Sequence, residues 1–402
     1  MATAKNAEQI RRRAEELEEK IIADRRWLHQ HPELSWKETG TTEFLAERLR
    51  EMGIEPRFYE GHTGLWAVLE GGKSGPGART ILLRADMDAL PIREENDIPY
   101  KSVHEGVMHA CGHDSHMAML LGGLRILSER RDELPGNVRI LFQGGEETAI
   151  GAKYYVEQGI LDGVDAVYGC HIAPWVNAPL LSANAGPRFA GTDEFAIQVE
   201  GKSCHGGMPQ QGFDAVVAAS AIVMNLQTVV SRRTDALDTL VVTVGVIRGG
   251  ESYNVVSGHA ELRGTVRTYS KEVQEGVPEK IRQVAENTAK AFGCTASLEY
   301  EKKTGPVVHT DPQMLRITHD AAVSLYGEEG VIDTRPTGGG DDFAYFLERV
   351  PGIYAFVGGA NPALGCTYPL HHPRFNLDES VLKRGAAMFA QVTEDYLGAD
   401  AE

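Results

Sequence analysis

The densest group of potential metal ligands in the sequence lies within residues 108–116. Cys111 and His113 are separated by a single glycine, so their side chains can converge on one point if the backbone is extended there. A thiolate and an imidazole together suit zinc and, to varying degrees, nickel, cobalt or manganese. The alternative is a buried cysteine beside a surface histidine, and this triplet alone does not decide between the two interpretations.

Two adjacent carboxylates, Glu146 and Glu147, follow a predicted strand and precede a predicted helix. Open α/β sheets place their sites at the carboxyl ends of strands, where one carboxylate can bind a metal while its neighbour acts as general base toward a metal-bound water. A pair of glutamates more often marks only a solvated helix start. Here, however, His171 ends the next predicted strand, and His371 and His372 follow a glycine-rich stretch. Donor groups at four such places indicate a metal centre.

Other suggestive motifs have simpler interpretations. Cys204 and His205 are adjacent, but neighbours on an extended chain point to opposite faces, so they are poorly placed to form a thiol-protease dyad. The glycine-rich residues 337–343 lack the Lys-Ser/Thr of a P-loop and the spacing of a dinucleotide fingerprint, so no nucleotide cofactor is expected. The remaining histidines are interpreted as structural or surface residues: His29, His62, His104, His109, His116, His259, His309 and His319.

The elements that position these residues follow from hydrophobic spacing. Residues 7–49 are predicted to form two helices around a break at His31 and Pro32. Buried strands then alternate with helices, which predicts an α/β sheet covered on both faces. The strands are expected at residues 80–83, 138–142 and 166–170, and the helices at 115–128 and 151–158.

The pattern changes near Phe189 to the order strand, helix, strand, strand, helix, strand, which predicts a ferredoxin-like insert. These elements are expected at residues 194–200, 214–231, 240–247, 259–267, 273–291 and 295–302. Helices at 313–325 and 380–396, with a strand at 354–357 between them, then complete the first domain. We therefore expect a catalytic domain made of residues 1–187 and 303–402, interrupted by an insert of residues 188–302.

Composition excludes several classes of protein. The chain has 402 residues with 40 basic and 57 acidic side chains, a net charge of −17 that would not attract nucleic acid. The most apolar stretch, residues 215–230, is interrupted by Ser220, Asn225 and Gln227 and suits a buried helix better than a membrane span. The start of the sequence lacks the apolar stretch of a signal peptide, and five widely spaced cysteines suit reduced thiols, so a cytoplasmic protein is expected.

Several of these motifs together resemble the two-metal aminoacylase and carboxypeptidase family, in particular its amidohydrolase branch of hippurate hydrolases and indoleacetyl-amino-acid hydrolases. They occur in the same order as in that family, from about His29 to Phe375. The motifs are RADMDALP at 84–91, HACGHD at 109–114, Glu146 and Glu147, the histidine of GCH at 169–171, GKSCH at 201–205 and LHHP at 370–373. The resemblance implies a zinc-peptidase-like catalytic domain, with a mixed sheet covered by helices and an inserted ferredoxin-like lid or dimerisation domain.

The resemblance also implies roles for individual residues. It implies two divalent metal ions (zinc, manganese, cobalt or nickel) in the site and makes Glu146 the catalytic base. Asp88 would not bind a metal itself but would orient one of the metal ligands. His371 is chosen over His372 because in relatives the ligand directly follows the leucine, although the sequence leaves this choice open. The implied ligands are Cys111, His113, Glu147, His171 and His371.

In the insert, the resemblance implies that His205 helps to bind the substrate carbonyl oxygen, often in the site of a partner subunit. Asn254 and Arg267 would contact the substrate carboxylate, and Gly339 would line the pocket through its backbone. The alternative for Arg267 is a solvated strand charge. A homodimer formed through the insert, or a higher oligomer built from it, is the expected assembly.

The sequence thus predicts a metal-dependent amidohydrolase that cleaves N-acyl amino acids through a metal-bridging water activated by Glu146. One alternative is a dipeptidase or metallocarboxypeptidase acting on short peptides with the same catalytic residues. Another is a non-catalytic metal- or ligand-binding protein, against which the pair of Glu146 and Glu147 argues. The branch usually has Pro-Ala before its glutamate pair, whereas this chain has Gly144 and Gly145, so a looser loop is expected there.

Overall fold

The computed structural model describes residues 2–399. The chain forms two compact units. The first, the catalytic unit, contains the residues up to Gly186, His309–Arg335 and the residues from Tyr345 onward. The second, the insert, contains Pro187–Val308 and Pro336–Ala344.

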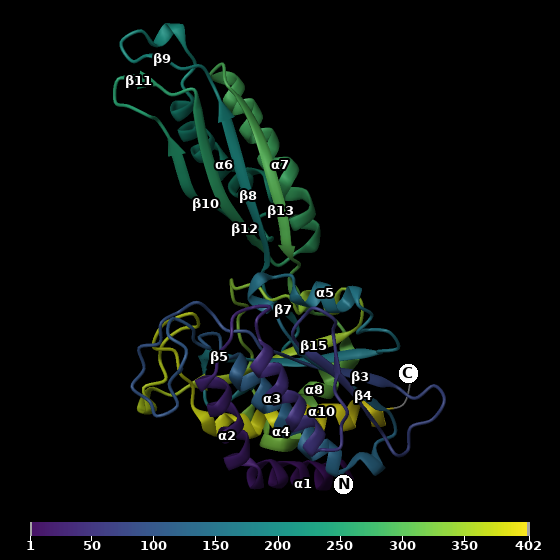
Figure 1. Ribbon diagram of the computed structural model, residues 1–402. Coiled ribbons are helices and arrows are strands. Elements are labelled where there is room, and N and C mark those ends of the chain that lie inside the picture. Colours follow the sequence, from purple (N-terminus) through teal and green to yellow (C-terminus); the bar gives the residue numbers. More distant parts are fainter. Residues whose placement is uncertain (1, 400–402) are drawn as a thin grey trace. The chain divides into compact units, whose positions relative to one another are not determined.

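The catalytic unit is built on a seven-stranded mixed sheet of order β1-β2-β4-β3-β5-β15-β6 (Figure 1). The four strands β4, β3, β5 and β15 are parallel, and all seven residues of β3 are buried. Buried parallel strands read as continuous apolar runs, which is why the sequence pattern revealed them. The strands are β1 (Arg57–Phe58), β2 (Leu65–Glu70), β3 (Thr80–Asp86), β4 (Asn137–Gln143), β5 (Ala166–Asn177), β6 (Leu181–Ser182) and β15 (Gly352–Ala360).

Helices α1, α2, α4, α8 and α10 pack on one another to form the main helical layer of this unit, below the sheet in Figure 1. The predicted first helix is in fact two helices, α1 and α2, which meet at Leu17. The helices of the unit are α1 (Ala2–Glu16), α2 (Glu18–Gln30), α3 (Thr39–Glu51), α4 (His113–Glu129), α5 (Gly151–Glu157), α8 (Pro312–Tyr326) and α10 (Leu382–Gly398).

The insert has the predicted ferredoxin-like order of elements, with an antiparallel sheet of order β10-β12-β8-β13. On β8, Phe195, Ile197 and Val199 are buried in the core of the insert, whereas alternate residues lie on the opposite face. The main elements are β8 (Gly191–Glu200), α6 (Ala215–Arg233), β10 (Leu240–Gly249), β12 (His259–Thr268), α7 (Lys271–Ala291) and β13 (Thr295–Thr304). Shorter strands are β7 (Gly186–Phe189), β9 (Cys204–His205), β11 (Val255–Val256) and β14 (Val307–His309), and the short helix α9 (Ala344–Leu347) belongs mostly to the catalytic unit.

The insert differs from the expected range of 188–302 by including residues 336–344, among them Gly339. Backbone hydrogen bonds explain the difference. The N–H of Thr337 donates to the carbonyl of Arg188 over 2.9 Å, and the N–H of Ala190 donates to the carbonyl of Gly339 over 2.8 Å.

Helix α6 is the one helix among the described residues that is long and apolar enough to cross a membrane, a test that the core helix of a globular domain can also pass. Its residues Ala218, Ile222 and Leu226 are buried in the core of the insert. Val217 and Met224 are exposed. The expectation of a buried helix therefore holds for one face of α6.

Candidate metal centre

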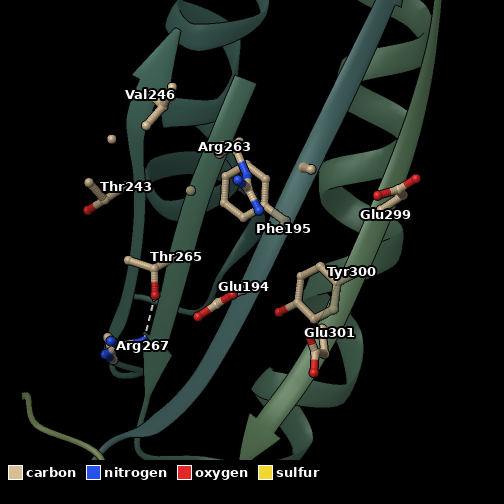
Figure 2. Close-up of a pocket in the computed structure, with 13 residues that line it drawn as sticks. Glu194, Phe195, Thr243, Val246, Arg263, Thr265, Arg267, Glu299, Tyr300 and Glu301 are labelled. Carbon is tan, nitrogen blue, oxygen red and sulfur yellow. Dashed lines mark hydrogen bonds between the residues drawn. The ribbon is translucent and has the colours of Figure 1, made fainter. Parts of the chain in front are cut away.

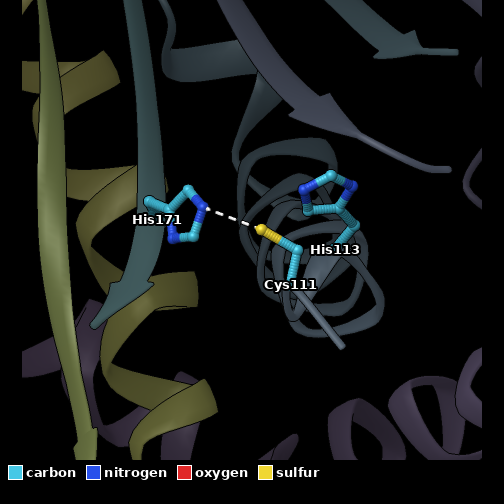
Figure 3. Close-up of side chains that lie close together, drawn as sticks. All are labelled: Cys111, His113 and His171. Carbon is cyan, nitrogen blue, oxygen red and sulfur yellow. Dashed lines mark hydrogen bonds between the residues drawn. The ribbon is translucent and has the colours of Figure 1, made fainter. Parts of the chain in front are cut away.

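The five side chains that the sequence analysis selects as ligands lie together in the catalytic unit. The donor atoms of Cys111, His113 and His171 lie within 4.8 Å of one another, and so do those of Cys111, Glu147 and His371. The sulfur of Cys111 is 3.6 Å from Nε2 of His171 (Figure 3). The two groups of donors share Cys111 and are therefore adjacent.

Hydrogen bonds fix which ring nitrogen of each histidine faces the cluster. Nδ1 of His113 donates to the backbone carbonyl of Asp88 over 2.8 Å. Its Nε2 is therefore directed at the carboxylates of Asp86, Glu146 and Glu147, each 3.9 Å away. Nδ1 of His171 donates to the carbonyl of Ile172 over 2.7 Å, which leaves Nε2 toward Cys111. Metal-ligating histidines characteristically donate their second ring N–H in this way.

The electrostatics of the cluster favour positive charge at its centre. Burial opposes charge on His113, but the carboxylates of Asp86 and Asp88 outweigh burial and raise the pKa of His113 to about 10. Burial raises the pKa of Glu147 to about 7, although His113 opposes this shift. Nε2 of His113 and Oε1 of Glu147 are buried and have no hydrogen-bond partner among the described residues. Orphaned nitrogen and oxygen donors beside a cysteine sulfur fit a divalent cation.

The turn that carries Glu146 and Glu147 is held by side chains at four consecutive backbone N–H groups. The N–H of Gly144 donates to the hydroxyl of Tyr155 over 3.0 Å, and that of Gly145 donates to Oε1 of Glu38 over 3.0 Å. The next two N–H groups donate to the two carboxylate oxygens of Asp88, over 3.1 Å for Glu146 and 2.9 Å for Glu147. All four N–H groups of this turn are therefore bound by side chains.

Asp88 lies behind the cluster, in the place that the sequence analysis gives it. Its carboxylate also accepts a hydrogen bond from Ser35 Oγ over 2.6 Å, and it is 3.4 Å from Nδ1 of His113. Burial would raise the pKa of Asp88, but the hydrogen bond and charge of His113 lower it below the usual value. Asp88 thus stays ionised and contacts both His113 and the turn.

The structure places His371 in the cluster and His372 outside it. The N–H of His371 donates to the carbonyl of Ala110 over 2.8 Å, and its Nε2 is 3.6 Å from Oε1 of Glu147. His372 stacks on Tyr368 instead, with ring centroids 4.5 Å apart. Among the described residues, the non-glycine residues with left-handed backbone are His371 (φ 63°), Trp36 (φ 64°) and Ala149 (φ 61°).

In the insert, His205 and Asn254 are neighbours at the end that carries β9 and β11 (Figure 1). The N–H of Gly206 donates to the carbonyl of Asn254 over 2.7 Å. Nδ1 of His205 accepts the N–H of Gly207 over 3.0 Å, so the ring proton of a neutral His205 resides on Nε2. His205 is exposed, and Nε2 is therefore a hydrogen-bond donor available to a ligand.

Arg267 lies toward the opposite end of the insert. It is on the open face of the sheet, where a cavity of about 570 Å³ is lined by Arg267, Arg263 and Glu194 among others (Figure 2). Nη1 of Arg267 donates to Thr265 Oγ1 over 2.5 Å. On β12, Arg267 comes eight residues after His259, which lies next to β11. At about 3.3 Å per residue this is a span of about 26 Å.

Gly339 belongs to the same end of the insert as Arg267. Its carbonyl accepts a hydrogen bond from the N–H of Ala190. The next residue, Gly191, pairs with Thr268 at the end of β12. The four insert residues therefore form two pairs at opposite ends, and the structure does not bring Asn254 and Arg267 together.

Sequence reasoning assigned no role to Glu38 or Trp36 and treated His116 as structural. Nδ1 of His116 donates to Asp86 over 2.6 Å, and its Nε2 accepts the N–H of Ile172 over 2.9 Å. His116 thereby joins α4 to the strand that carries His171. Its position one helical turn after His113 was the available signal, whereas Glu38 and Trp36 gave none.

Comparisons with known proteins agree with this geometry. Residues 82–395 match the family model "Peptidase family M20/M25/M40". The chain is 39% identical over 386 residues to N-acetyl-L-cysteine deacetylase of Bacillus subtilis, covering 96% of this chain and 90% of that protein. It is 36% identical to thermostable carboxypeptidase 2 of Saccharolobus solfataricus, covering 95% and 97% of the two chains.

The crystal structure of the Bacillus subtilis YXEP protein, described as a dinuclear metal binding peptidase from the M20 family, matches with a TM-score of 0.84. Its sequence is 35% identical, and the match covers 96% of this chain and 99% of that one. This likeness confirms the predicted fold class. The resemblance inferred from the motifs is also confirmed, and the chain belongs to peptidase family M20/M25/M40.

Proposed function

We propose that this chain is a metal-dependent amidohydrolase that cleaves N-acyl amino acids, such as N-acetyl or N-benzoyl amino acids, into a carboxylic acid and an amino acid. The observation that carries the proposal is the pair of adjacent donor groups sharing Cys111, with the carboxylate of Glu146 beside them. Membership of the family and the similarity to an N-acetyl-L-cysteine deacetylase support the reaction and its substrate class.

The proposed ligands of two divalent ions of zinc, manganese, cobalt or nickel are Cys111, His113, Glu147, His171 and His371. When bound, such ions polarise the amide carbonyl and lower the pKa of a bound water. Glu146 accepts the proton of the attacking water and passes it to the leaving nitrogen. Asp88 holds Glu146 and its neighbour in place by accepting their backbone N–H groups.

His205 is the proposed hydrogen-bond donor to the oxyanion that develops on the substrate carbonyl, since its Nε2 carries the proton. Asn254, the neighbour of His205, and Arg267, at the end that carries Gly339, are the proposed contacts to the substrate carboxylate, and Gly339 lines the pocket through its backbone. One insert holds these two pairs about 26 Å apart along its sheet. A small substrate cannot contact both pairs of one rigid insert, which supports a site completed by His205 and Asn254 of a second copy.

A homodimer formed through the insert is therefore part of the proposal. Strand β10 is an edge of the four-stranded sheet, and its Val241 and Ile247 are exposed. Val217 and Met224 on α6 are exposed as well. An unpaired edge and apolar side chains on the same domain suit a self-complementary two-fold contact.

We also propose a cytoplasmic location and no nucleic-acid or membrane partner. None of the five cysteines, all of which lie among the described residues, forms a disulfide, which is typical of a reducing compartment. The net charge of −17 opposes contact with a phosphate backbone.

The second candidate is a carboxypeptidase or dipeptidase, which the carboxypeptidase of Saccharolobus solfataricus favours. A hydrolysis screen separates the two. N-acetyl, N-benzoyl and indoleacetyl amino acids and dipeptides are offered to protein loaded with zinc, manganese, cobalt or nickel, with Glu146→Gln as the matched inactive control. We expect faster cleavage of N-acyl amino acids. Cleavage of dipeptides alone would favour the second candidate.

A further inference from the structure

The turn that carries Glu146 is contacted by a short segment, residues 35–38, to which the proposed function gives no role. The buried carboxylate of Glu38 accepts the N–H of Gly145 over 3.0 Å, the peptide group directly before Glu146. The other oxygen of Glu38 accepts a hydrogen bond from the hydroxyl of Thr63. Glu38 is therefore held on one side by Thr63 and holds the turn on the other.

Trp36 contacts the same glycine through its ring. A Cβ atom built on Gly145 would lie 2.4 Å from Cε2 and 2.5 Å from Cζ2 of the Trp36 indole. Gly145 also has a left-handed backbone, with φ 73°. Only glycine, which has no Cβ, lets the indole approach this closely without displacing the turn. Gly145 stands where the branch usually has alanine, and the missing methyl group leaves space that the Trp36 ring occupies.

This segment is hydrogen-bonded to the chain beside Asp88, just after strand β3 ends. The N–H of Ala89 donates to the carbonyl of Glu33 over 2.8 Å. Within the segment, the N–H of Lys37 donates to the carbonyl of Leu34 over 2.9 Å and so forms a turn. Trp36 itself has a left-handed backbone. Strained residues of this kind persist where the surrounding contacts fix them.

We propose that Trp36 and Glu38 are positioning residues that fix the backbone of the Gly144–Glu147 turn and thereby aim Glu146 at its reaction partner. Neither residue belongs to the groups of donor atoms that form the metal centre, so both act through Gly145. The inference rests on the role proposed above for Glu146. It adds residues whose loss lowers turnover while the ligands remain intact.

A double-substitution experiment tests the contact between Trp36 and Gly145. The variants are Trp36→Ala, Gly145→Ala and the two combined. Gly163→Ala is the matched control, because Gly163 also has a left-handed backbone (φ 72°) but a Cβ there would meet nothing within 4 Å. All are assayed for kcat, KM and metal content in excess metal.

We expect Gly163→Ala to keep its turnover. Gly145→Ala should lose at least about 10-fold in kcat, because a misplacement of about 1 Å can cost about 100-fold. If the two residues act through one contact, the combined variant is no worse than the poorer single variant. Losses that multiply in the combined variant would overturn the coupling.

Glu38 is tested by a conservative and a disruptive substitution. Glu38→Gln keeps an oxygen that can accept the N–H of Gly145, whereas Glu38→Ala removes it. We expect Glu38→Ala to lower kcat at least about 10-fold with KM within about 2-fold, and Glu38→Gln to keep most of the turnover. Equal losses in both variants, or a change confined to KM, would contradict a positioning role.

The failure of this inference is distinguishable from failure of the proposed function. Glu146→Gln with undiminished hydrolysis would refute the function of Glu146, whatever Glu38 and Trp36 do. An inactive Glu146→Gln together with fully active Glu38→Ala and Gly145→Ala would leave that function standing and refute the positioning role alone.

Discussion

Asp88 provides a graded test of how the turn supports the metal centre. Its carboxylate accepts the buried N–H of Glu146, the partly buried N–H of Glu147 and the hydroxyl of Ser35. Asp88→Ala leaves both N–H groups without acceptors, and each buried unsatisfied group costs about 1–3 kcal/mol. The cost to the bound geometry is then about 2–6 kcal/mol. A metal-free turn can rearrange and so avoid this cost. The cost therefore falls on the metal-bound state and weakens metal binding.

Asp88→Asn should be intermediate, because its amide oxygen can accept one of the two N–H groups while its NH₂ faces the other. The expected loss is about 1–3 kcal/mol, or about 5- to 150-fold in metal affinity. Ser35→Ala is the control and removes only the hydroxyl contact, worth about 1 kcal/mol. Metal affinity is measured by competition with a chelator. Equal affinity in Asp88→Ala and Ser35→Ala would refute the reasoning.

Four further predictions follow from the site and the insert. Glu146→Gln should keep its metal and lose at least about 100-fold in turnover, whereas retained metal in Glu147→Gln with metal lost from Glu146→Gln would reverse the two roles. Cys111→Ala should lower the metal content and abolish hydrolysis; full metal content by elemental analysis would contradict its role as a shared ligand. Mixing inactive Glu146→Gln with inactive His205→Ala chains should restore some activity through heterodimers, and a fully active monomer in light scattering would exclude delivery of His205 by a second chain. Burial raises the pKa of Glu38 from 4.5 to about 6. A carboxyl group whose pKa is raised by folding destabilises the fold once the pH exceeds its pKa in the unfolded chain. The free energy of unfolding of Glu38→Gln relative to wild type, measured by denaturant titration, should therefore increase by about 2 kcal/mol between pH 4.5 and 7. No change would contradict this burial effect.

The residues that the sequence analysis proposed as donors could be selected because their positions rest on local patterns. Cys111 and His113 stand beside the start of a helix, and Glu146 and Glu147 follow a buried strand whose apolar run is recognisable. The ends of parallel strands meet at one edge of a sheet, so donors that are far apart in sequence can be expected to converge. The choice of His371 over His372 came from the resemblance.

The supporting residues escaped prediction because their roles depend on contacts between distant backbone segments. Glu38 acts on a peptide N–H more than a hundred residues away, and no side-chain pattern records that contact. Gly339 belongs to the insert because of hydrogen bonds across the sequence between residues near 190 and near 339. The separation of Asn254 from Arg267 follows from the length of β12, a strand that the sequence did predict.

The three non-glycine residues with left-handed backbone in the described part of the chain, Trp36, Ala149 and His371, all adjoin the candidate metal centre or the turn beside it. Each such residue stores about 1–2 kcal/mol of backbone strain. Laboratory evolution that rewards only heat resistance will therefore favour glycine at these positions, and at Trp36 and His371 the gain removes a side chain for which we propose a role. Ala149 is different because its methyl group has no assigned task. An engineer seeking a sturdier catalyst should begin there and leave the other two strained residues unchanged.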